Sequence, residues 1–409
     1  MRSWMRVALA VFGVAWGANQ FAPLLLVYRE HLSEAVVTAL FGSYAIGLIP
    51  ALLVAASCSD RFGRRRVMRP VLLLSAAASM VLLAAGDSVA VLAAGRLLAG
   101  VASGAAFGPG SAWIKELSAD GGPGAGARRA ALALSAGFGG GPLVAGALAQ
   151  WLPAPDVLPY VVHLLLMATI APLAWFAPET VASPGKAPGA RRIAWGATLR
   201  HPEFLRRVVP TAPLVFGAAT VSFALLPSLV PVPSLGIAAG GGIAGLTLGS
   251  GAAVQPLARR LARRGSAGIR TVGLVTGTAG FALAAAAVDG KQPFLLPPAA
   301  VALGGCYGLL LVAGLSCVEA LGAPEELAGV AAVFYCLTYL GLLLPYAVSA
   351  VAGAVPPAVS LLAAGAVTAV LIPVTAAGGG VPRTRAAPSS SIGPPSAALG
   401  TADDSSAQS

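Results

Sequence analysis

The sequence contains few charged residues, few histidines and few cysteines. Only 10% of the 409 residues are charged, whereas soluble domains carry about a quarter. The four cysteines (Cys58, Cys306, Cys317 and Cys336) have neither disulfide nor metal-ligand spacing. The chain also lacks a Walker loop, an HExxH pair, paired carboxylates within an apolar run and a Ser/His/Asp set. These absences argue against an enzyme, and they leave no candidate catalytic residue, metal site or cofactor site.

Long apolar runs make up most of the chain. Hydrophobic residues account for 57% of it, and runs of roughly 20 residues, enough for a helix to cross a bilayer, recur along it. Backbone groups in lipid must satisfy each other, so we expect helices. We predict an all-α integral membrane protein with twelve spans, at residues 7–28, 33–57, 67–86, 88–114, 128–150, 157–177, 208–230, 236–257, 270–288, 294–318, 326–350 and 355–375.

The net charge of +11 does not indicate nucleic-acid binding, because the basic residues lie in short segments between apolar runs. With the N-terminus inside the cell, 23 of the 26 Lys and Arg residues fall on the cytoplasmic face. This bias supports an even number of spans in the cell membrane, with both termini cytoplasmic. We read residues 7–28 as an uncleaved first span, since this run is too long for a signal peptide.

The spans divide into two sets of six. Residues 178–207, rich in Pro, Gly and Arg, are predicted to form a cytoplasmic linker between bundles 1–177 and 208–375, and residues 376–409 a disordered tail. The basic pattern that begins at Asp60-Arg61-x-Gly63-Arg64-Arg65 has a weaker counterpart at Gln255-Pro256-x-Ala258-Arg259-Arg260. Each copy lies between the second and third spans of its half, which indicates an internal repeat.

Four motifs, taken in this order, resemble the major facilitator superfamily. The first is the basic loop, with Ala56 where the family has glycine. The others are Arg96-x-x-x-Gly100, Gly137-x-x-x-Gly141-Pro142-x-x-x-Gly146, and Pro178-Glu179-Thr180. The resemblance covers residues 1 to about 375. It implies a twelve-helix secondary transporter of the drug or metabolite:proton antiporter branch, with two pseudo-symmetric bundles around a substrate cavity.

The resemblance also implies residues that control the conformational change. Asp60 is expected to meet the start of a helix in the second half, where a carboxylate stabilises the helix N-terminus. Arg64, Arg65 or Arg66 could pair with Glu325 or Glu326 when the cytoplasmic side closes; otherwise the cluster is a simple topology anchor. The expected gating set comprises Asp60, Arg61, Gly63, Arg64, Arg65, Gly100, Gly104, Gly137, Gly141, Pro142 and Gly146. The glycines could equally serve close helix packing alone.

Polar side chains inside spans are candidates for the substrate cavity. Arg96 lies within the fourth span, where an arginine is costly and usually faces a cavity or a partner. Its alternative role is to bind backbone carbonyls. Asn19 and Gln20 in the first span need partners, which a substrate or another helix could supply. His163 in the sixth span could contribute to the cavity, or it could be a packing residue.

The predicted function is export of a small organic molecule by alternating access, coupled to protons, by a monomer. The fifth-span motif favours proton-coupled efflux through the resemblance alone. The chain itself weakens proton coupling, because no acidic residue lies well inside a span. The alternative is import of a small nutrient or metabolite. The apolar spans disfavour strongly charged substrates.

Overall fold

We describe a computed structural model that covers residues 1–122, 124–181, 197–262, 265–322 and 327–376. In this part of the chain, twelve helical spans are long and apolar enough to cross a membrane. The predicted all-α fold with twelve spans is therefore confirmed. The span boundaries differ from the predicted ones by a few residues, mainly because several helices continue past the apolar run into their charged ends.

The first six spans are built from seven helices. The first span is broken at Gln20 into two helices, and the next five are continuous. Their bounds are α1 (Ser3–Asn19), α2 (Phe21–Tyr28), α3 (Glu34–Phe62), α4 (Arg64–Leu83), α5 (Val89–Glu116), α6 (Ala125–Trp151) and α7 (Leu158–Trp175), with the short helix η1 (Ala119–Gly121) before α6.

The last six spans are less regular. Two π-helical turns interrupt the seventh span, and a short 3-10 turn interrupts the eleventh. The eighth span is one continuous helix, although it contains three consecutive glycines at 240–242. After the short helix α8 (Ala197–Arg200), the elements are η2 (Phe204–Val208), α9 (Ala212–Thr220), η3 (Val221–Leu225), α10 (Leu226–Leu229), α11 (Gly236–Ala262), α12 (Ser266–Asp289), η4 (Pro293–Leu295), α13 (Leu296–Leu321), α14 (Leu327–Tyr339), η5 (Leu340–Leu343), α15 (Leu344–Val351) and α16 (Pro357–Ala376).

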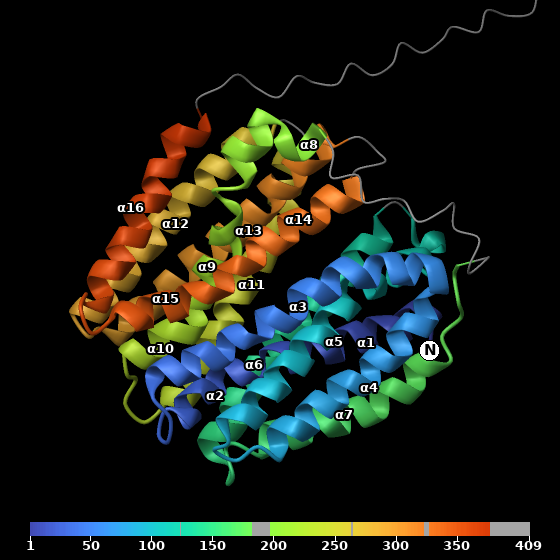
Figure 1. Cartoon of the computed structure of the whole chain (residues 1–409), viewed down its shortest axis with the longest axis horizontal. Helices are drawn as coiled ribbons and strands as arrows, with labels where there is room; N and C mark the ends of the chain where they lie inside the picture. The colour runs from blue at the N-terminus through green and yellow to red at the C-terminus, as the bar shows by residue number, and fades with distance from the viewer. Residues whose placement is uncertain (123, 182–196, 263–264, 323–326, 377–409) are drawn as a thin grey trace, which may run out of the picture.

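The helices form two groups that lie side by side (Figure 1). Helices α1 to α7 pack mainly on one another, and so do the elements from α9 to α16. The groups meet where α11 crosses α6 and α2, and where α3 packs on α14, η5 and α15. We propose that these groups are the predicted bundles 1–177 and 208–375. The predicted tail, 376–409, lies outside the described residues except for its first residue, and so does the middle of the predicted linker, 182–196.

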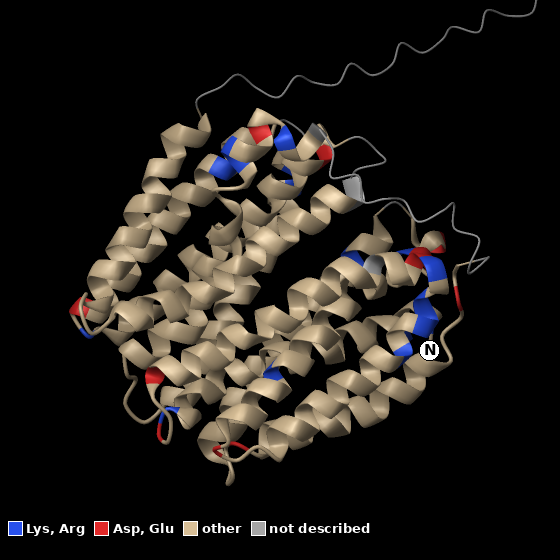
Figure 2. Ribbon diagram, viewed as in Figure 1, with Lys and Arg blue, Asp and Glu red and all other residues tan. Residues whose placement is uncertain are grey.

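Charged residues gather at the helix ends, and most of the basic ones lie at a single end of the molecule (Figure 2). We call this end the linker side; it carries Asp60–Arg66 and Glu203–Arg207. The opposite end, the far side, carries the short loops 29–33 and 290–292. An apolar middle between charged ends is the charge distribution that a bilayer requires.

Glycines allow close contact between neighbouring helices in the first group. A Cβ atom at Gly100 would lie 2.1 Å from the carbonyl oxygen of Tyr44, and one at Gly104 would lie 2.3 Å from that of Leu48. Helices α3 and α5 therefore touch backbone to backbone. The predicted gating glycines Gly100 and Gly104 thus lie in a seam inside one group.

Candidate functional site

A cavity of about 940 Å³ lies between the two helix groups. Its walls come from α3, α5 and α6 on one side and from α9, α11, α13 and α14 on the other. Lys115, Arg259 and Glu319, at the linker-side ends of α5, α11 and α13, lie among its lining residues. On the far side the two groups are in contact. The cavity therefore opens toward the linker side.

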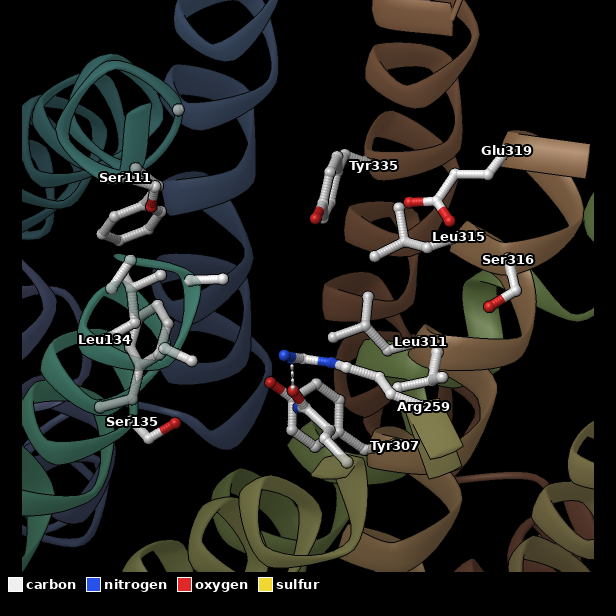
Figure 3. A pocket seen from close by; sticks show the side chains of 18 of the residues that line it. Ser111, Leu134, Ser135, Arg259, Tyr307, Leu311, Leu315, Ser316, Glu319 and Tyr335 are labelled. Carbon is white, nitrogen blue, oxygen red and sulfur yellow. Dashed lines mark hydrogen bonds between the residues drawn. The ribbon is translucent and has the colours of Figure 1, made fainter. Parts of the chain in front are cut away.

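The two walls differ in chemistry (Figure 3). The wall from α5 and α6 is mainly apolar, with Phe107, Leu134 and Phe138, and its hydroxyl groups come from Ser111 and Ser135. The opposite wall is polar and aromatic. Its polar and aromatic side chains are Phe216, Gln255, Arg259, Tyr307, Ser316, Glu319, Tyr335 and Tyr339, and the aliphatic residues Leu311, Val312 and Leu315 lie among them.

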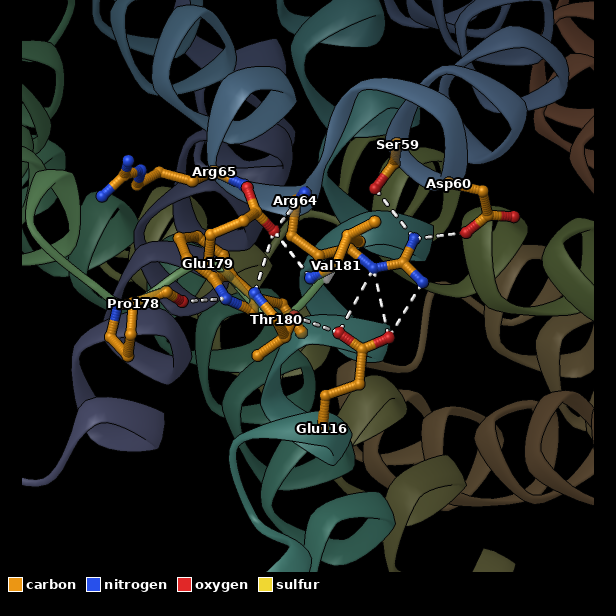
Figure 4. Close-up of polar contacts among 10 residues, drawn as sticks. Ser59, Asp60, Arg64, Arg65, Glu116, Pro178, Glu179, Thr180 and Val181 are labelled. Atoms are coloured by element: carbon orange, nitrogen blue, oxygen red, sulfur yellow. Dashed lines mark hydrogen bonds and ion pairs between the residues drawn. The ribbon is translucent and has the colours of Figure 1, made fainter. Parts of the chain in front are cut away.

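The basic loop between α3 and α4 forms a charged cluster at the linker side (Figure 4). Arg64 is its centre: the guanidinium donates hydrogen bonds to Ser59, Asp60 and Glu116, with 2.9 Å from Nη2 to Glu116 Oε1. Thr180 also donates a hydrogen bond to Glu116. One arginine thus ties the end of α3 to the end of α5 and, through Glu116, to the segment that follows α7.

Glu179 caps the start of α4. Its carboxylate accepts hydrogen bonds from the backbone N–H groups of Arg64 and Arg65, both at 2.9 Å, and from those of Thr180 and Val181. Burial raises the pKa of this carboxyl group, but the four N–H donors outweigh burial and hold its pKa below the usual range. Gly63 has a φ of 98°, and a Cβ there would lie 2.5 Å from the carboxylate, so a side chain would displace the cap.

The other members of the predicted gating loop point outward. Asp60 is 65% exposed and pairs with Arg64 within its own helix group. The guanidinium of Arg61 lies over the ring of Phe62, 5.2 Å from its centroid. The expected partners Glu325 and Glu326 lie outside the described residues. The role of this loop in gating therefore stays a prediction.

Arg96 is fully enclosed within the first helix group. It is 1% exposed, and its guanidinium donates hydrogen bonds of 3.3 Å to the carbonyl oxygens of Ala18 and Phe41. The same group lies 4.5 Å from the ring centroid of Phe21 and 4.8 Å from that of Tyr44. Arg96 thus binds one backbone carbonyl beside the break between α1 and α2 and one in α3. Binding carbonyls is the alternative role stated for it in the sequence analysis.

Gln20 and His163 belong to a buried polar chain. The Gln20 amide donates to Ser79 at 3.1 Å, and the Ser79 hydroxyl lies 2.7 Å from Nδ1 of His163. The other ring nitrogen, Nε2, lies 3.0 Å from the carbonyl oxygen of Gly13. Both Gln20 and His163 have no exposed surface. These hydrogen bonds join α1, α4 and α7 within one helix group.

The four residues predicted for the cavity are therefore not among those that line it in this conformation. Gln20, Arg96 and His163 are buried, and Asn19 is half-buried elsewhere in α1. The residues that do line it include Gln255 and Arg259, which the sequence had shown only as part of the weaker repeat. Tyrosines 307, 335 and 339 were not predicted for the cavity, because aromatic residues in an apolar span do not reveal which way they face.

The small residues of α6 make two different contacts. Gly137 and Gly141 face α1, where a Cβ would lie 2.4 Å from Phe12 O and 2.5 Å from Trp16 O. Gly146 faces the other helix group: a Cβ there would lie 3.0 Å from the Cα of Gly241 in α11. A Cβ at Gly241 would in turn lie 2.5 Å from the carbonyl oxygen of Pro142. The motif thus serves packing at one end and the contact between groups at the other.

Comparisons with known proteins agree with this architecture. A variant of the nucleoside transporter NupG superposes with a TM-score of 0.71 at 14% identity, covering 91% of this chain and 98% of that one. The human organic anion transporter MFSD10 (TETRAN) superposes with a TM-score of 0.66 at 18% identity, covering 91% and 99%. These identities are low, so the superpositions establish the fold alone. A search of curated proteins gave no match.

The family assignment rests on the sequence itself. The model of the Major Facilitator Superfamily matches residues 7–345, which span eleven of the twelve helical spans wholly or in part. The superpositions, the twelve spans and the cavity between two helix groups are consistent with this family. The chain belongs to the Major Facilitator Superfamily of membrane transporters.

Proposed function

We propose that this protein is a secondary active transporter that exports a small organic molecule by alternating access, coupled to protons. The observation that carries the proposal is the cavity of about 940 Å³, which opens on the linker side while the two helix groups meet on the far side. This volume suits an organic molecule of ordinary metabolite or drug size. A site that is open on one side and closed on the other is the arrangement that alternating access requires.

The distribution of positive charge supports a cytoplasmic linker side. Most Lys and Arg residues lie there, and short cytoplasmic loops carry the excess of basic residues in membrane proteins. The linker and both termini are then cytoplasmic, and the conformation is inward-facing. An exporter takes up its cargo in this state, and we assign the protein to the cell membrane, as a monomer.

Import is the second candidate function. Its support is the fold shared with NupG, a nucleoside transporter, over 91% of the chain. Export is supported by the resemblance of the α6 motif to that of antiporters, and by the mainly apolar wall formed by α5 and α6. The two candidates require opposite net fluxes, so a transport assay separates them.

Accumulation of organic compounds in an efflux-deficient bacterial host tests the proposal. Cells that express the protein should accumulate less of a transported compound, and an uncoupler should abolish the difference. Gly108 lines the cavity, and a Cβ there would meet nothing within 4 Å. Gly108→Trp should therefore fill the cavity and abolish the flux. Gly305→Trp is the matched control, because Gly305 has similar open space but is not among the lining residues.

Higher accumulation in expressing cells would favour import. Efflux that persists in full after treatment with an uncoupler would contradict proton coupling. Equal flux in the wild type and in Gly108→Trp would contradict transport through this cavity.

A further inference from the structure

The two walls of the cavity differ in polarity, and this difference restricts which ligands fit. Apart from two serines and Lys115, its α5 and α6 wall offers apolar surface, whereas hydrogen-bonding groups concentrate on the α11, α13 and α14 wall. A ligand that fills it needs an apolar body on one side and a polar group on the other. Among the described residues, the charges along its lining are two cations, Lys115 and Arg259, and one anion, Glu319. The lining therefore carries a net positive charge.

Arg259 points into the cavity beside Tyr307 (Figure 3). Its Nη2 donates a 2.9 Å hydrogen bond to Oε1 of Gln255, a neutral partner. Among the described residues, no carboxylate lies within 4.0 Å of this guanidinium. A guanidinium has five N–H donors in a planar fork that matches a carboxylate. Gln255 thus holds the fork in place while most of its donors face the cavity.

Aromatic rings form part of the same wall as this cation. The rings of Phe216 and Tyr339 are stacked, with centroids 4.7 Å apart and planes 9° from parallel. The ring of Tyr307 lies 5.4 Å from that of Phe216. All three residues line the cavity, and Tyr335 lies further along the same wall. Ring faces of this kind favour offset stacking with another planar ring.

We propose that the cavity binds planar aromatic organic anions. The carboxylate of the ligand binds Arg259, its ring packs on the aromatic group of Phe216, Tyr307 and Tyr339, and its remaining apolar surface contacts Leu134 and Phe138. Glu319, on the same wall, disfavours a second anionic group nearby and favours a monoanion. This proposal rests on the proposed transport function and names its substrate class.

Three probes that share one ring system test the proposal: 2-naphthoate, its neutral amide 2-naphthamide, and the cation 2-naphthylmethylammonium. Binding is measured by equilibrium dialysis on the full-length protein in lipid nanodiscs. We expect 2-naphthoate to bind at least about tenfold more tightly than the amide, because a charge-assisted fork of hydrogen bonds replaces a neutral contact. The ammonium probe should bind most weakly.

Two variants separate the charge from the ring. Arg259→Gln should abolish the preference for 2-naphthoate over the amide and leave binding of the amide nearly unchanged. Arg260→Gln is the matched control: it removes the neighbouring cation of the same helix, which is not among the lining residues, and should keep the preference. Phe216→Leu should weaken both probes by a similar factor, about twofold to tenfold.

The proposal is overturned if the amide or the ammonium probe binds as tightly as 2-naphthoate, if none of the three probes binds, or if Arg259→Gln and Arg260→Gln behave alike. Flux of each probe into proteoliposomes then tests transport separately. Flux of the ammonium or amide without 2-naphthoate would refute the anion site and leave the transporter intact. Binding of 2-naphthoate that depends on Arg259, without flux, would support the site and refute transport.

Discussion

At the scale of single residues, Arg96 shows how a cation is accommodated inside an apolar bundle. The break between α1 and α2 leaves the carbonyl oxygen of Ala18 without a continuous helix beyond it, and Arg96 donates to that oxygen. The rings of Phe21 and Tyr44 surround the guanidinium. Carbonyl oxygens and ring faces are both electron-rich, so they stabilise a buried cation without a carboxylate.

Arg96→Ala should therefore destabilise the protein. Two carbonyl oxygens lose this donor, and the rings of Phe21 and Tyr44 lose the cation beside them, at a cost on the order of 2–4 kcal/mol. A thermal unfolding assay in detergent should show a lower Tm, and Arg96→Lys should recover only part of it, because an ammonium group cannot form the planar fork. Leu97→Ala, a change at an exposed neighbour, is the control. An unchanged Tm with lost substrate binding would instead indicate direct contact with the ligand.

Glu179 predicts a pH dependence of stability. Its folded pKa is depressed, so its stabilisation is present above the unfolded pKa of about 4.3 and is lost as the pH falls through the folded value. Glu179→Gln weakens the cap on α4 by about 1 kcal/mol at neutral pH. The difference in Tm between wild type and variant should be largest near pH 7 and should shrink below about pH 4. A difference that is constant from pH 3 to pH 7 would rule out this role for the carboxylate.

At the scale of elements, α6 and α11 form part of the contact that closes the far side. Their backbones touch at Gly146 and Gly241. One turn beyond Gly146, the side chain of Gln150 accepts hydrogen bonds from the N–H groups of Ile237 (3.0 Å) and Ala238 (3.2 Å) at the start of α11. A side chain of one helix group therefore caps a helix of the other. Small residues allow the approach, and the cap fixes its register.

A side chain at this crossing should push the groups apart. Gly241→Val places atoms against the carbonyl oxygen of Pro142, so we expect it to favour a conformation that is open on the far side. Gly242→Val is the matched control, because a Cβ at Gly242 meets nothing within 4 Å. Spin labels at Asp87 and Lys291, both exposed on the far side, should move several ångströms apart in Gly241→Val only. Identical distance distributions in both variants would show that this seam does not hold the far side closed.

At the scale of the whole molecule, far-side contact and linker-side opening are two aspects of one conformation. Rocking of one helix group against the other would break the contacts of Gln150 and narrow the mouth near Lys115 and Glu319. Contacts made in only one conformation bias the equilibrium toward it. Loss of the Gln150 cap should therefore reduce access to the cavity from the linker side.

Cysteine accessibility measures this coupling. In a protein whose four native cysteines are replaced, Ser135→Cys lies in the cavity wall and should react with an impermeant maleimide from the linker side. Adding Gln150→Ala should slow that reaction about twofold to tenfold. The loss of an uncharged helix cap shifts the equilibrium between the two conformations by about 1 kcal/mol. Gln292→Ala is the control, because Gln292 is also a far-side glutamine but its side chain lies against Gly290 of its own loop. An unchanged rate with Gln150→Ala would show that the far-side contact of Gln150 is not coupled to opening on the linker side.

Much of the fold could be predicted, but little of the cavity. The twelve spans follow from apolar length, and the position of the basic loop follows from the cost of arginine in lipid. The α6 motif indicated close packing, though not that Gly137 faces α1 while Gly146 faces α11. Polarity alone led to Gln20, Arg96 and His163 as cavity residues, because a buried polar side chain needs a partner and the sequence cannot say whether that partner is protein or ligand.

The sequence by itself determined the spans, the loops that must stay in water and the family. These depend on the transfer of each side chain into lipid, which is a property of residue type and of neighbours along the chain. Tertiary structure alone decided that Arg96 meets carbonyls and rings within one helix group, and that Arg259 faces the cavity. These facts depend on helix rotation, and rotation is fixed by contacts between helices far apart in the chain.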